Sequence, residues 1–344
     1  MSSRSVIVQA ALAALALLFA YATWQRQPEL TSGEVFVLEV TKNDLQRVRY
    51  EDQEAKSFAE LAKDKDAAGP FVTVRLSGYD NTGANVPAGH PGVVLKMPER
   101  VIRGSESAQR LFDKFAPLRG KRALGVLDGA KSKELGLDTT KKFLEIHARG
   151  WKRRFAIVPA PPGGSDPYIK DVQDNRVYVV DRPILTDLQA ATTNLVDRKL
   201  HAFRIEEVDR VVITGSKKRL EFVGSRIEQF PGIRLAPVGA PDKADATLKN
   251  WHDRIFGLFP TEVLGKGENP ASGAPTVTLK LEYFSRGRPI GWTELARTKP
   301  PAASTTTAQT PDVMVRSEHT LGWYRVGSDA SALLTEGETL LQKK

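Results

Sequence analysis

Beyond residue 33 the chain runs twice through the same order of expected elements: a strand, an amphipathic helix, two hairpins and a closing helix. The match is clearest at the first hairpins, where alternating apolar strands flank Arg149-Gly150 in one half and Arg286-Gly287 in the other. Such a repeat restricts the fold strongly, although two copies are too few for a solenoid. The sequence therefore predicts an α+β protein of two pseudo-repeated lobes, each of mostly antiparallel sheet with amphipathic helices.

Each half is expected to open with an alternating strand, over residues 34–40 in the first half and 202–213 in the second. A helix follows in both halves. Ser105 is placed to cap the first helix, whose apolar positions continue to Leu118, and Asp242 is placed to cap the second. These helices would bury one face against the sheet of their own lobe.

The lobe boundaries follow from this pattern. The first lobe is expected over residues 34–200 and the second, a diverged copy, over residues 201–344, with the joint near residues 197–201. Three segments rich in turn-forming residues are expected to be mobile loops: residues 77–92, 265–275 and 298–312. A loop as long as the last is usually either functional or disordered.

Residues 1–26 are predicted to be a membrane anchor. Residues 6–24 form one apolar run without a charge, and about 18 such residues can cross the hydrocarbon core of a bilayer. Arg4 precedes the run, which favours a cytoplasmic N-terminus, a single pass through the inner membrane and a periplasmic remainder. A signal peptide cleaved after Ala22 is the alternative, because residues 20–22 have the A-x-A form of a processing site. Both alternatives export the rest of the chain.

The amino-acid composition excludes several kinds of binding partner and of chemistry. The chain has no cysteine, so disulfides, thiolate metal sites and cysteine nucleophiles are excluded. Its net charge of +9 would suit nucleic acid, but the basic residues are spread along the chain without a nucleic-acid-binding motif. An exported domain beside an anionic membrane surface also gains from basic residues. We therefore expect a membrane surface nearby and no nucleic-acid partner.

The sequence contains no recognisable catalytic motif. A nucleophile elbow, a zinc-protease motif, a phosphate-binding loop and a dinucleotide fingerprint are all missing. The five histidines lie far apart, and none has the spacing of a metal-ligand pair. The Gly-Gly-Ser-Asp-Pro tract at residues 163–167 is typical of a turn rather than of a nucleophile loop. We expect a non-enzymatic protein without a cofactor or a metal.

Basic residues gather at three expected turns. If the lobes are pseudo-symmetric, two of these turns occupy equivalent hairpin tips. Such a surface would suit an anionic lipid, an anionic polysaccharide or an acidic partner. The alternative is that the turns are polar because they face water. The candidate binding residues are Arg149, Lys152, Arg153, Arg154, Lys217, Lys218, Arg219, Arg286 and Arg288.

Several tracts resemble the DUF4340 domain family. The resemblance covers residues 35–264 well and the C-terminal part weakly, and Leu135 stands where the family usually has an aromatic residue. The tracts are structural, so the resemblance implies no catalytic residues. They are Leu111…Phe115…Leu118-Arg119…Arg122…Leu124-Gly125, Gly136-Leu137-Asp138, Tyr168…Asp174…Val177-Tyr178-Val179-Val180 and Leu195-Val196-Asp197-Arg198-Lys199-Leu200…Phe203.

Proteins of the DUF4340 family resemble membrane-tethered auxiliary components of ABC-type transport systems, including the gliding-motility type. The resemblance implies an accessory or scaffold subunit of a transport or cell-envelope complex, with an integral membrane permease and an ATPase as partners. The basic turns favour a different function, an extracytoplasmic binding module for an anionic envelope polymer or a lipid surface. The sequence leaves both functions open.

Overall fold

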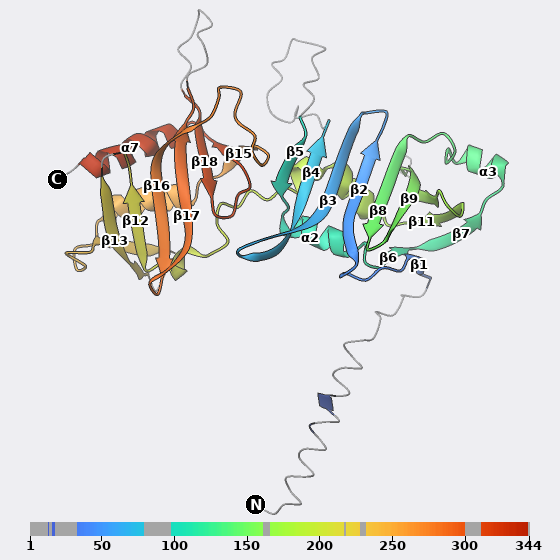
Figure 1. Ribbon diagram of the computed structural model, residues 1–344, viewed down its shortest axis with the longest axis horizontal. Coiled ribbons are helices and arrows are strands. Elements are labelled where there is room, and N and C mark those ends of the chain that lie inside the picture. Colours follow the sequence, from blue (N-terminus) through green and yellow to red (C-terminus); the bar gives the residue numbers. More distant parts are fainter. Residues whose placement is uncertain are drawn as a thin grey trace, which may run out of the picture.

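The two halves of the chain form two antiparallel sheets that stand side by side (Figure 1). The fold class is α+β with mostly antiparallel sheet, as predicted. Within the described residues no helix is both long and apolar enough to cross a bilayer. The predicted anchor at residues 1–26 lies almost entirely outside them. The computed structural model describes residues 33–78, 98–160, 166–216, 218–227, 232–299 and 311–342, and also residues 13, 16 and 17.

The first lobe is built on a nine-stranded sheet in the order β5-β4-β3-β2-β8-β9-β10-β11-β7. Every neighbouring pair is antiparallel. Alternate residues along most of β2 are buried, which explains why apolar and polar residues alternate in its sequence. The strands are β2 (Leu45–Asp52), β3 (Ser57–Asp66), β4 (Gly69–Ser77), β5 (Arg100–Arg103), β7 (Arg122–Val126), β8 (Lys142–Ala148), β9 (Trp151–Val158), β10 (Tyr168–Asp171) and β11 (Arg176–Val179).

The second lobe repeats this order with one strand fewer. Its eight strands run β14-β13-β12-β16-β17-β18-β19-β15, which matches β4-β3-β2-β8-β9-β10-β11-β7 strand for strand and leaves β5 without a counterpart. The two sheets therefore share one topology. The strands are β12 (Arg210–Thr214), β13 (Arg219–Arg226), β14 (Ile233–Pro237), β15 (Pro260–Val263), β16 (Thr276–Ser285), β17 (Arg288–Arg297), β18 (Val313–Ser317) and β19 (Tyr324–Val326).

Amphipathic helices pack on both sheets. In the first lobe α2, α4 and α5 contact β4 or β2, and in the second lobe α6 and α7 contact β14, β16 and each other. The indole N–H of Trp251 on α6 donates to the carbonyl of Leu333 on α7 at 2.8 Å, which joins these two helices. The helices are α2 (Glu106–Asp113), α3 (Gly129–Glu134), α4 (Arg182–Gln189), α5 (Ala191–Asn194), α6 (Ala246–Phe256) and α7 (Ala330–Gln342).

The predicted first hairpins and their turns are confirmed. β8 and β9 pair around Arg149-Gly150, and β16 and β17 pair around Arg286-Gly287. In the second lobe both turn residues have positive φ, 51° at Arg286 and 74° at Gly287. This conformation belongs to type I′ turns, whose twist matches that of the paired strands, and glycine adopts it without strain.

The predicted helices lie where they were expected, but some of their ends differ from the prediction. Ser105 caps α2 as predicted. The helix ends at Asp113 and does not extend to Leu118, the last of the predicted apolar positions, because Pro117 has no N–H to continue a helix. The cap of α6 is Asp245 and not Asp242, because the Asp245 carboxylate accepts two backbone N–H groups of the first turn, at 2.8 and 3.0 Å.

Both opening strands are shorter than predicted. β1 (Val35–Leu38) pairs with β6 (Leu118–Gly120) in a separate two-stranded sheet and does not join the main sheet. In the second half residues 205–207 form a 3-10 turn, so β12 begins only at Arg210. Of the predicted mobile loops, residues 265–275 are described. Most of the other two loops lies outside the described residues.

Candidate functional site

Two buried arginines, Arg100 and Arg103, lie where the two lobes meet. β5, the edge strand of the first sheet, lies beside the loop that follows β15 in the second lobe (Figure 1). The side chain of Arg100 on β5 is only 8% exposed and reaches into the second lobe. Its guanidinium donates to the carboxylates of Glu262 at 3.1 Å and Glu268 at 2.8 Å, and to the carbonyl of Val263 at 3.1 Å. We call these contacts the arginine lock.

A tight loop brings the second lobe against β5. The backbone N–H of Lys266 donates to the carbonyl of Val101 at 2.8 Å. Gly265 lies so close that a Cβ there would be 3.0 Å from the Cα of Arg100, so a larger residue would push the lobes apart. The carboxylate of Glu268 accepts the N–H of Gly265 at 2.7 Å. The loop thereby fixes the carboxylate that holds Arg100.

A second set of contacts joins the lobes through Asp197. Its carboxylate lies 2.9 Å from Nε2 of His319, and its carbonyl accepts the hydroxyl of Tyr324 at 3.1 Å. Burial raises the pKa of Asp197, but the hydrogen bond from His319 helps to outweigh burial and the pKa is held below its ordinary value. Arg103 donates to the carbonyl of His319 at 2.6 Å. The expected joint at residues 197–201 is therefore packed against both lobes.

A cavity of about 310 Å³ opens beside these contacts. Asp197, His319 and His201 line it at the junction, and Glu106 lines it from the start of α2. Lys199, which also lines the cavity, lies 2.8 Å from Glu106, and Asp197 pairs with His319. These contacts hold the charged groups that line the cavity in position.

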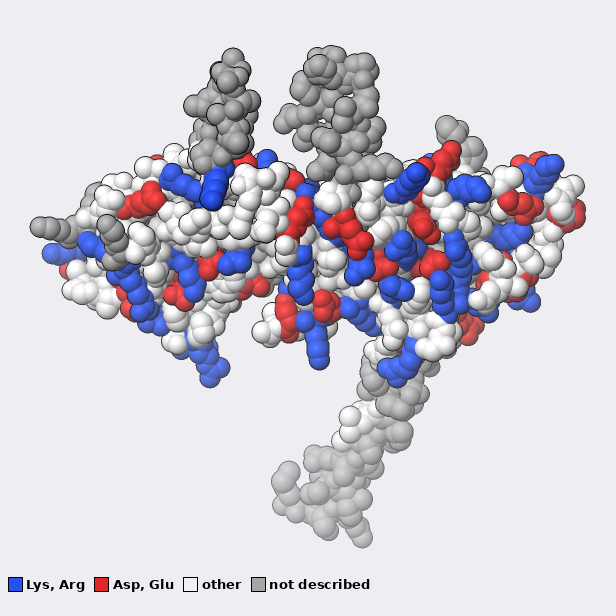
Figure 2. Space-filling view, turned by 45° about the horizontal axis from the view of Figure 1, so that its top comes forward, with Lys and Arg blue, Asp and Glu red and all other residues white. Residues whose placement is uncertain are grey.

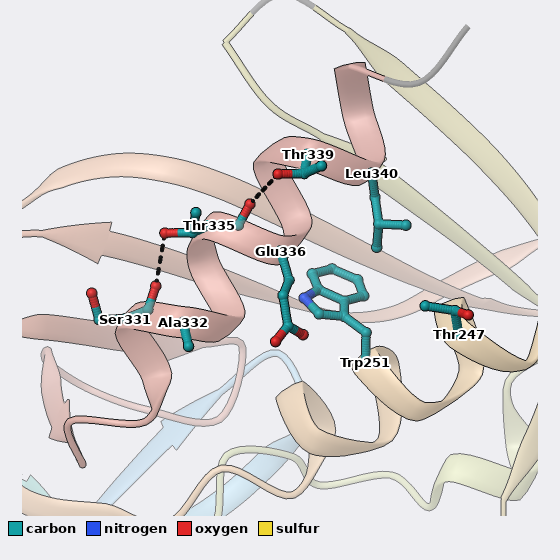
Figure 3. Close-up of a pocket in the computed structure, with 8 residues that line it drawn as sticks. All are labelled: Thr247, Trp251, Ser331, Ala332, Thr335, Glu336, Thr339 and Leu340. Carbon is teal, nitrogen blue, oxygen red and sulfur yellow. Dashed lines mark hydrogen bonds between the residues drawn. The ribbon is translucent and has the colours of Figure 1, made fainter.

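A larger groove of about 520 Å³ lies between α6 and α7 (Figure 3). Trp251 forms its floor, and Leu340 points toward the indole ring. The threonine hydroxyls along α7 bond to carbonyls one turn earlier, Thr335 to Ser331 at 3.1 Å and Thr339 to Thr335 at 2.9 Å. The groove therefore combines an apolar floor with a wall on which the hydroxyls of Thr335 and Thr339 bond within α7.

The basic residues predicted for the first turn all lie in ion pairs. Arg149 is the exposed turn residue, whereas the others lie on β9. Lys152 and Arg154 point to one face of the sheet and Arg153 to the other, since strand side chains alternate. The pairs are Arg149–Asp44 at 3.8 Å, Lys152–Glu145 at 3.0 Å, Arg154–Glu145 at 3.4 Å and Arg153–Asp171 at 3.1 Å.

The other predicted basic residues are separated from this group. Arg286 lies in the turn after β16 and Arg288 begins β17, at the same end of the molecule as the turn after β8 (Figure 1). β12 and β16 are antiparallel, so the turn that leads to Arg219 lies at the opposite end. Lys218 is exposed, and Lys217 lies outside the described residues. The three turns therefore do not share one end of the molecule.

Sequence reasoning missed Arg100 and Arg103. They flank two apolar residues in a short strand, and arginines are mostly exposed in proteins. The partners of Arg100 lie more than 160 residues away, at Glu262 and Glu268. The sequence shows a glycine at position 265, but no residue near it in the chain indicates that it contacts β5.

The described residues contain no group of three histidine or acidic side chains that could hold a metal ion. No family model, curated protein or solved structure matches the chain. The structure defines its class as a two-lobed α+β protein with a polar junction. The resemblance to the DUF4340 family rests on the sequence tracts alone.

Proposed function

We propose that this protein is a membrane-anchored, extracytoplasmic scaffold subunit of a transport or cell-envelope complex, without catalytic activity. The apolar run at residues 6–24 supports a single-pass tether in the inner membrane with a cytoplasmic N-terminus. The lobes then lie in the periplasm and dock on an integral membrane permease that works with an ATPase. The resemblance to the DUF4340 family supports these partners.

The arginine lock is the observation that carries this proposal. A scaffold has to hold its docking surfaces at a fixed separation. Removing one partner of a buried ion pair typically costs about 3–5 kcal/mol, so the contacts of Arg100 oppose separation of the lobes. The ionisable groups of the junction are also paired with one another, which supports a cohesive role for them.

The shared strand order supports a further part of the proposal, that the lobes are two copies of one ancestral unit. Eight strands follow the same order in both sheets. A duplicated unit offers two related surfaces at a set distance, which suits a subunit that contacts two neighbours in a complex. The extra strand β5 then marks where the first copy acquired its contact with the second.

A pull-down tests the proposal directly. The full-length protein is solubilised in detergent from its native membrane, captured and analysed by mass spectrometry. We expect a permease and an ATPase in stoichiometric amounts. A protein that is recovered alone would contradict the scaffold function.

Two matched variants connect the function to the junction. Arg100→Gln breaks the arginine lock and leaves the N-terminal run unchanged, so we expect most of the permease to be lost from the pull-down. Arg110→Gln makes the same chemical change at a side chain that is 69% exposed, and its recovery should equal that of the parent protein. Equal losses in both variants would exclude the lock as the reason.

A further inference from the structure

One face of the first sheet carries a regular array of charged residues. Val48 and Tyr50 on β2 point into the core, 0% and 2% exposed, so Arg49 between them points to the opposite face. The helices that contact β2 and β4 belong to the core side, where Gln189 of α4 donates to the hydroxyl of Tyr50 at 3.2 Å, and in Figure 1 the strands lie toward the viewer. Five residues of this face lie directly opposite one another on adjacent strands. They are Arg75 on β4, Glu60 on β3, Arg49 on β2, Glu145 on β8 and Arg154 on β9, which we call the charge ladder.

The charge ladder presents its cations outward. The two carboxylates are almost buried, with side chains 5% exposed at Glu60 and 10% at Glu145. The three arginine side chains are 26% to 45% exposed. Arg49 lies 3.5 Å and Arg75 lies 3.8 Å from Glu60, and Arg154 lies 3.4 Å from Glu145. A ligand that approaches this face therefore meets guanidinium groups before it meets carboxylates.

Further cations flank the ladder. Arg47 lies 3.5 Å from Glu60, and Lys152 lies 3.0 Å from Glu145. Burial and the neighbouring Arg47 lower the pKa of His147, so this histidine is neutral near pH 7. Figure 2 shows basic and acidic side chains interleaved over this lobe, in the right half of the view. The rim of the face adds two carboxylates, Glu51 at 3.8 Å from Arg154 and Glu99 at 3.4 Å from Arg75.

Aromatic rings orient two of the arginines. The guanidinium of Arg49 lies 3.8 Å from the centre of the Phe58 ring, and that of Arg154 lies 4.0 Å from the centre of the Phe143 ring. Stacking of this kind holds a guanidinium in place. A planar guanidinium held in this way is ready to bind a carboxylate or a sulfate with two hydrogen bonds.

The second sheet repeats this combination of arginine, aromatic ring and carboxylate. It does so on the face of β12 opposite the buried Val211 and Ile213. The combination is therefore a property of both lobes. Its two instances are Arg210, 3.9 Å from the Phe284 ring centre and 2.7 Å from Glu221, and Arg316, 4.4 Å from the Trp323 ring centre and 2.7 Å from Glu294.

The spacing of the arginines in the charge ladder determines how far apart the acidic groups of a ligand have to be. Its arginines stand on alternate strands, and adjacent strands lie about 4.8 Å apart, so the guanidinium groups recur about every 10 Å over about 20 Å. We infer that the charge ladder binds a linear acidic polysaccharide that crosses the strands and carries an acidic group at about this interval. The inference places anionic-polymer binding on the broad sheet face rather than at the hairpin turns. It stands independently of the proposed scaffold function.

Two other polyanions fit this surface less well. An extended peptide repeats its same-face side chains about every 6.7 Å, and extended peptides bind at sheet edges, where they can pair with the backbone. An anionic bilayer presents mobile headgroups without a fixed interval, so it has no reason to match the spacing of the ladder. Both are included in the test as competing ligands.

Binding to hyaluronan tests the inference, because its carboxylates recur on every second sugar. Uncharged dextran is the matched polymer control, and polyglutamate and phosphatidylglycerol vesicles represent the two competing ligands. We expect the full-length protein to bind hyaluronan more tightly than any of the other three. This binding should weaken as the salt concentration rises, because the contacts are ionic and exposed.

Paired variants identify the surface. Arg49→Gln combined with Arg154→Gln should weaken hyaluronan binding by about tenfold or more, since it removes two charge-assisted contacts. Arg286→Gln combined with Arg288→Gln removes the same charge at the hairpin turn of the other lobe, and it should leave binding within about twofold. Arg49→Lys combined with Arg154→Lys keeps the charge and the pairing with the buried carboxylates, so it should fold and bind with intermediate affinity.

Several results would overturn the inference. If the Arg49→Gln, Arg154→Gln protein is folded, as judged by thermal unfolding, and still binds hyaluronan, then the ladder is not part of the binding site. An equal loss in the Arg286→Gln, Arg288→Gln protein would assign binding to the turns. Tighter binding of polyglutamate or vesicles, or no binding to any polyanion, would exclude the polysaccharide. The pull-down of the permease has no bearing on these results.

Discussion

Among single residues, His252 is unusual because it is buried and lacks a hydrogen-bond partner. Its side chain is 0% exposed, and neither ring nitrogen has a partner among the described residues. Burial lowers the pKa of His252 from its ordinary value of 6.5, although the Asp253 carboxylate lies 3.8 Å away. The folded protein keeps the ring neutral, whereas the unfolded chain binds a proton as the pH falls below about 6.5. Protein stability is therefore lost as the pH falls through this range.

The variant His252→Phe removes this titration. We expect its free energy of unfolding, measured in urea, to fall less than that of the parent between about pH 7.5 and pH 5.5. His147→Gln is the matched control: burial lowers the pKa of His147 as well, but its side chain is 19% exposed, so a smaller change is expected. An unchanged pH dependence in His252→Phe would show that this residue is not the acid-sensitive group.

At the scale of elements, Gly337 allows α7 to lie close to its neighbours. A Cβ at this position would be 2.5 Å from Cδ1 of Leu279 and 2.6 Å from Cζ2 of Trp251. The indole of Trp251 is held by its hydrogen bond to Leu333. Gly337→Ala should therefore lower the free energy of unfolding by about 1–3 kcal/mol through overpacking, even though alanine favours a helix by about 1 kcal/mol.

Urea unfolding of two glycine variants checks this packing. Gly129→Ala, in α3, is the control because a Cβ there would meet nothing within 4 Å. It should leave stability unchanged or raise it by up to about 1 kcal/mol. If Gly337→Ala were as stable as Gly129→Ala, the close approach of α7 to Trp251 and Leu279 would be refuted.

Elements that depend on local chemistry could be predicted from the sequence. The hairpin at Arg149-Gly150 needs only alternating strands and a glycine in the turn, and both are adjacent in the chain. The charge ladder could not be predicted, because Arg49 meets Glu145 only after β2 pairs with β8, which follows about ninety residues later. The same applies to Arg100, since its surroundings depend on which sheet edges meet.

At the scale of the whole molecule, the arginine lock should make the two lobes unfold together. We expect the parent protein to show one thermal transition by calorimetry. Arg100→Gln leaves Glu262 and Glu268 without their shared cation, and it should split this transition into two. Arg110→Gln, at an exposed position on α2, should retain the single transition of the parent. A single transition in Arg100→Gln would mean that other contacts couple the lobes.

The position of β5 in the chain has a consequence for folding during synthesis. β5 is the outermost strand of the first sheet, and the partners of Arg100 are made only near the end of β15 and in the loop after it. Until then β5 is an open sheet edge, a kind of surface that pairs readily with other chains and aggregates. Charged side chains on such an edge oppose this pairing. We therefore expect Arg100 and Arg103 to protect the nascent first lobe from aggregation until the second lobe is made.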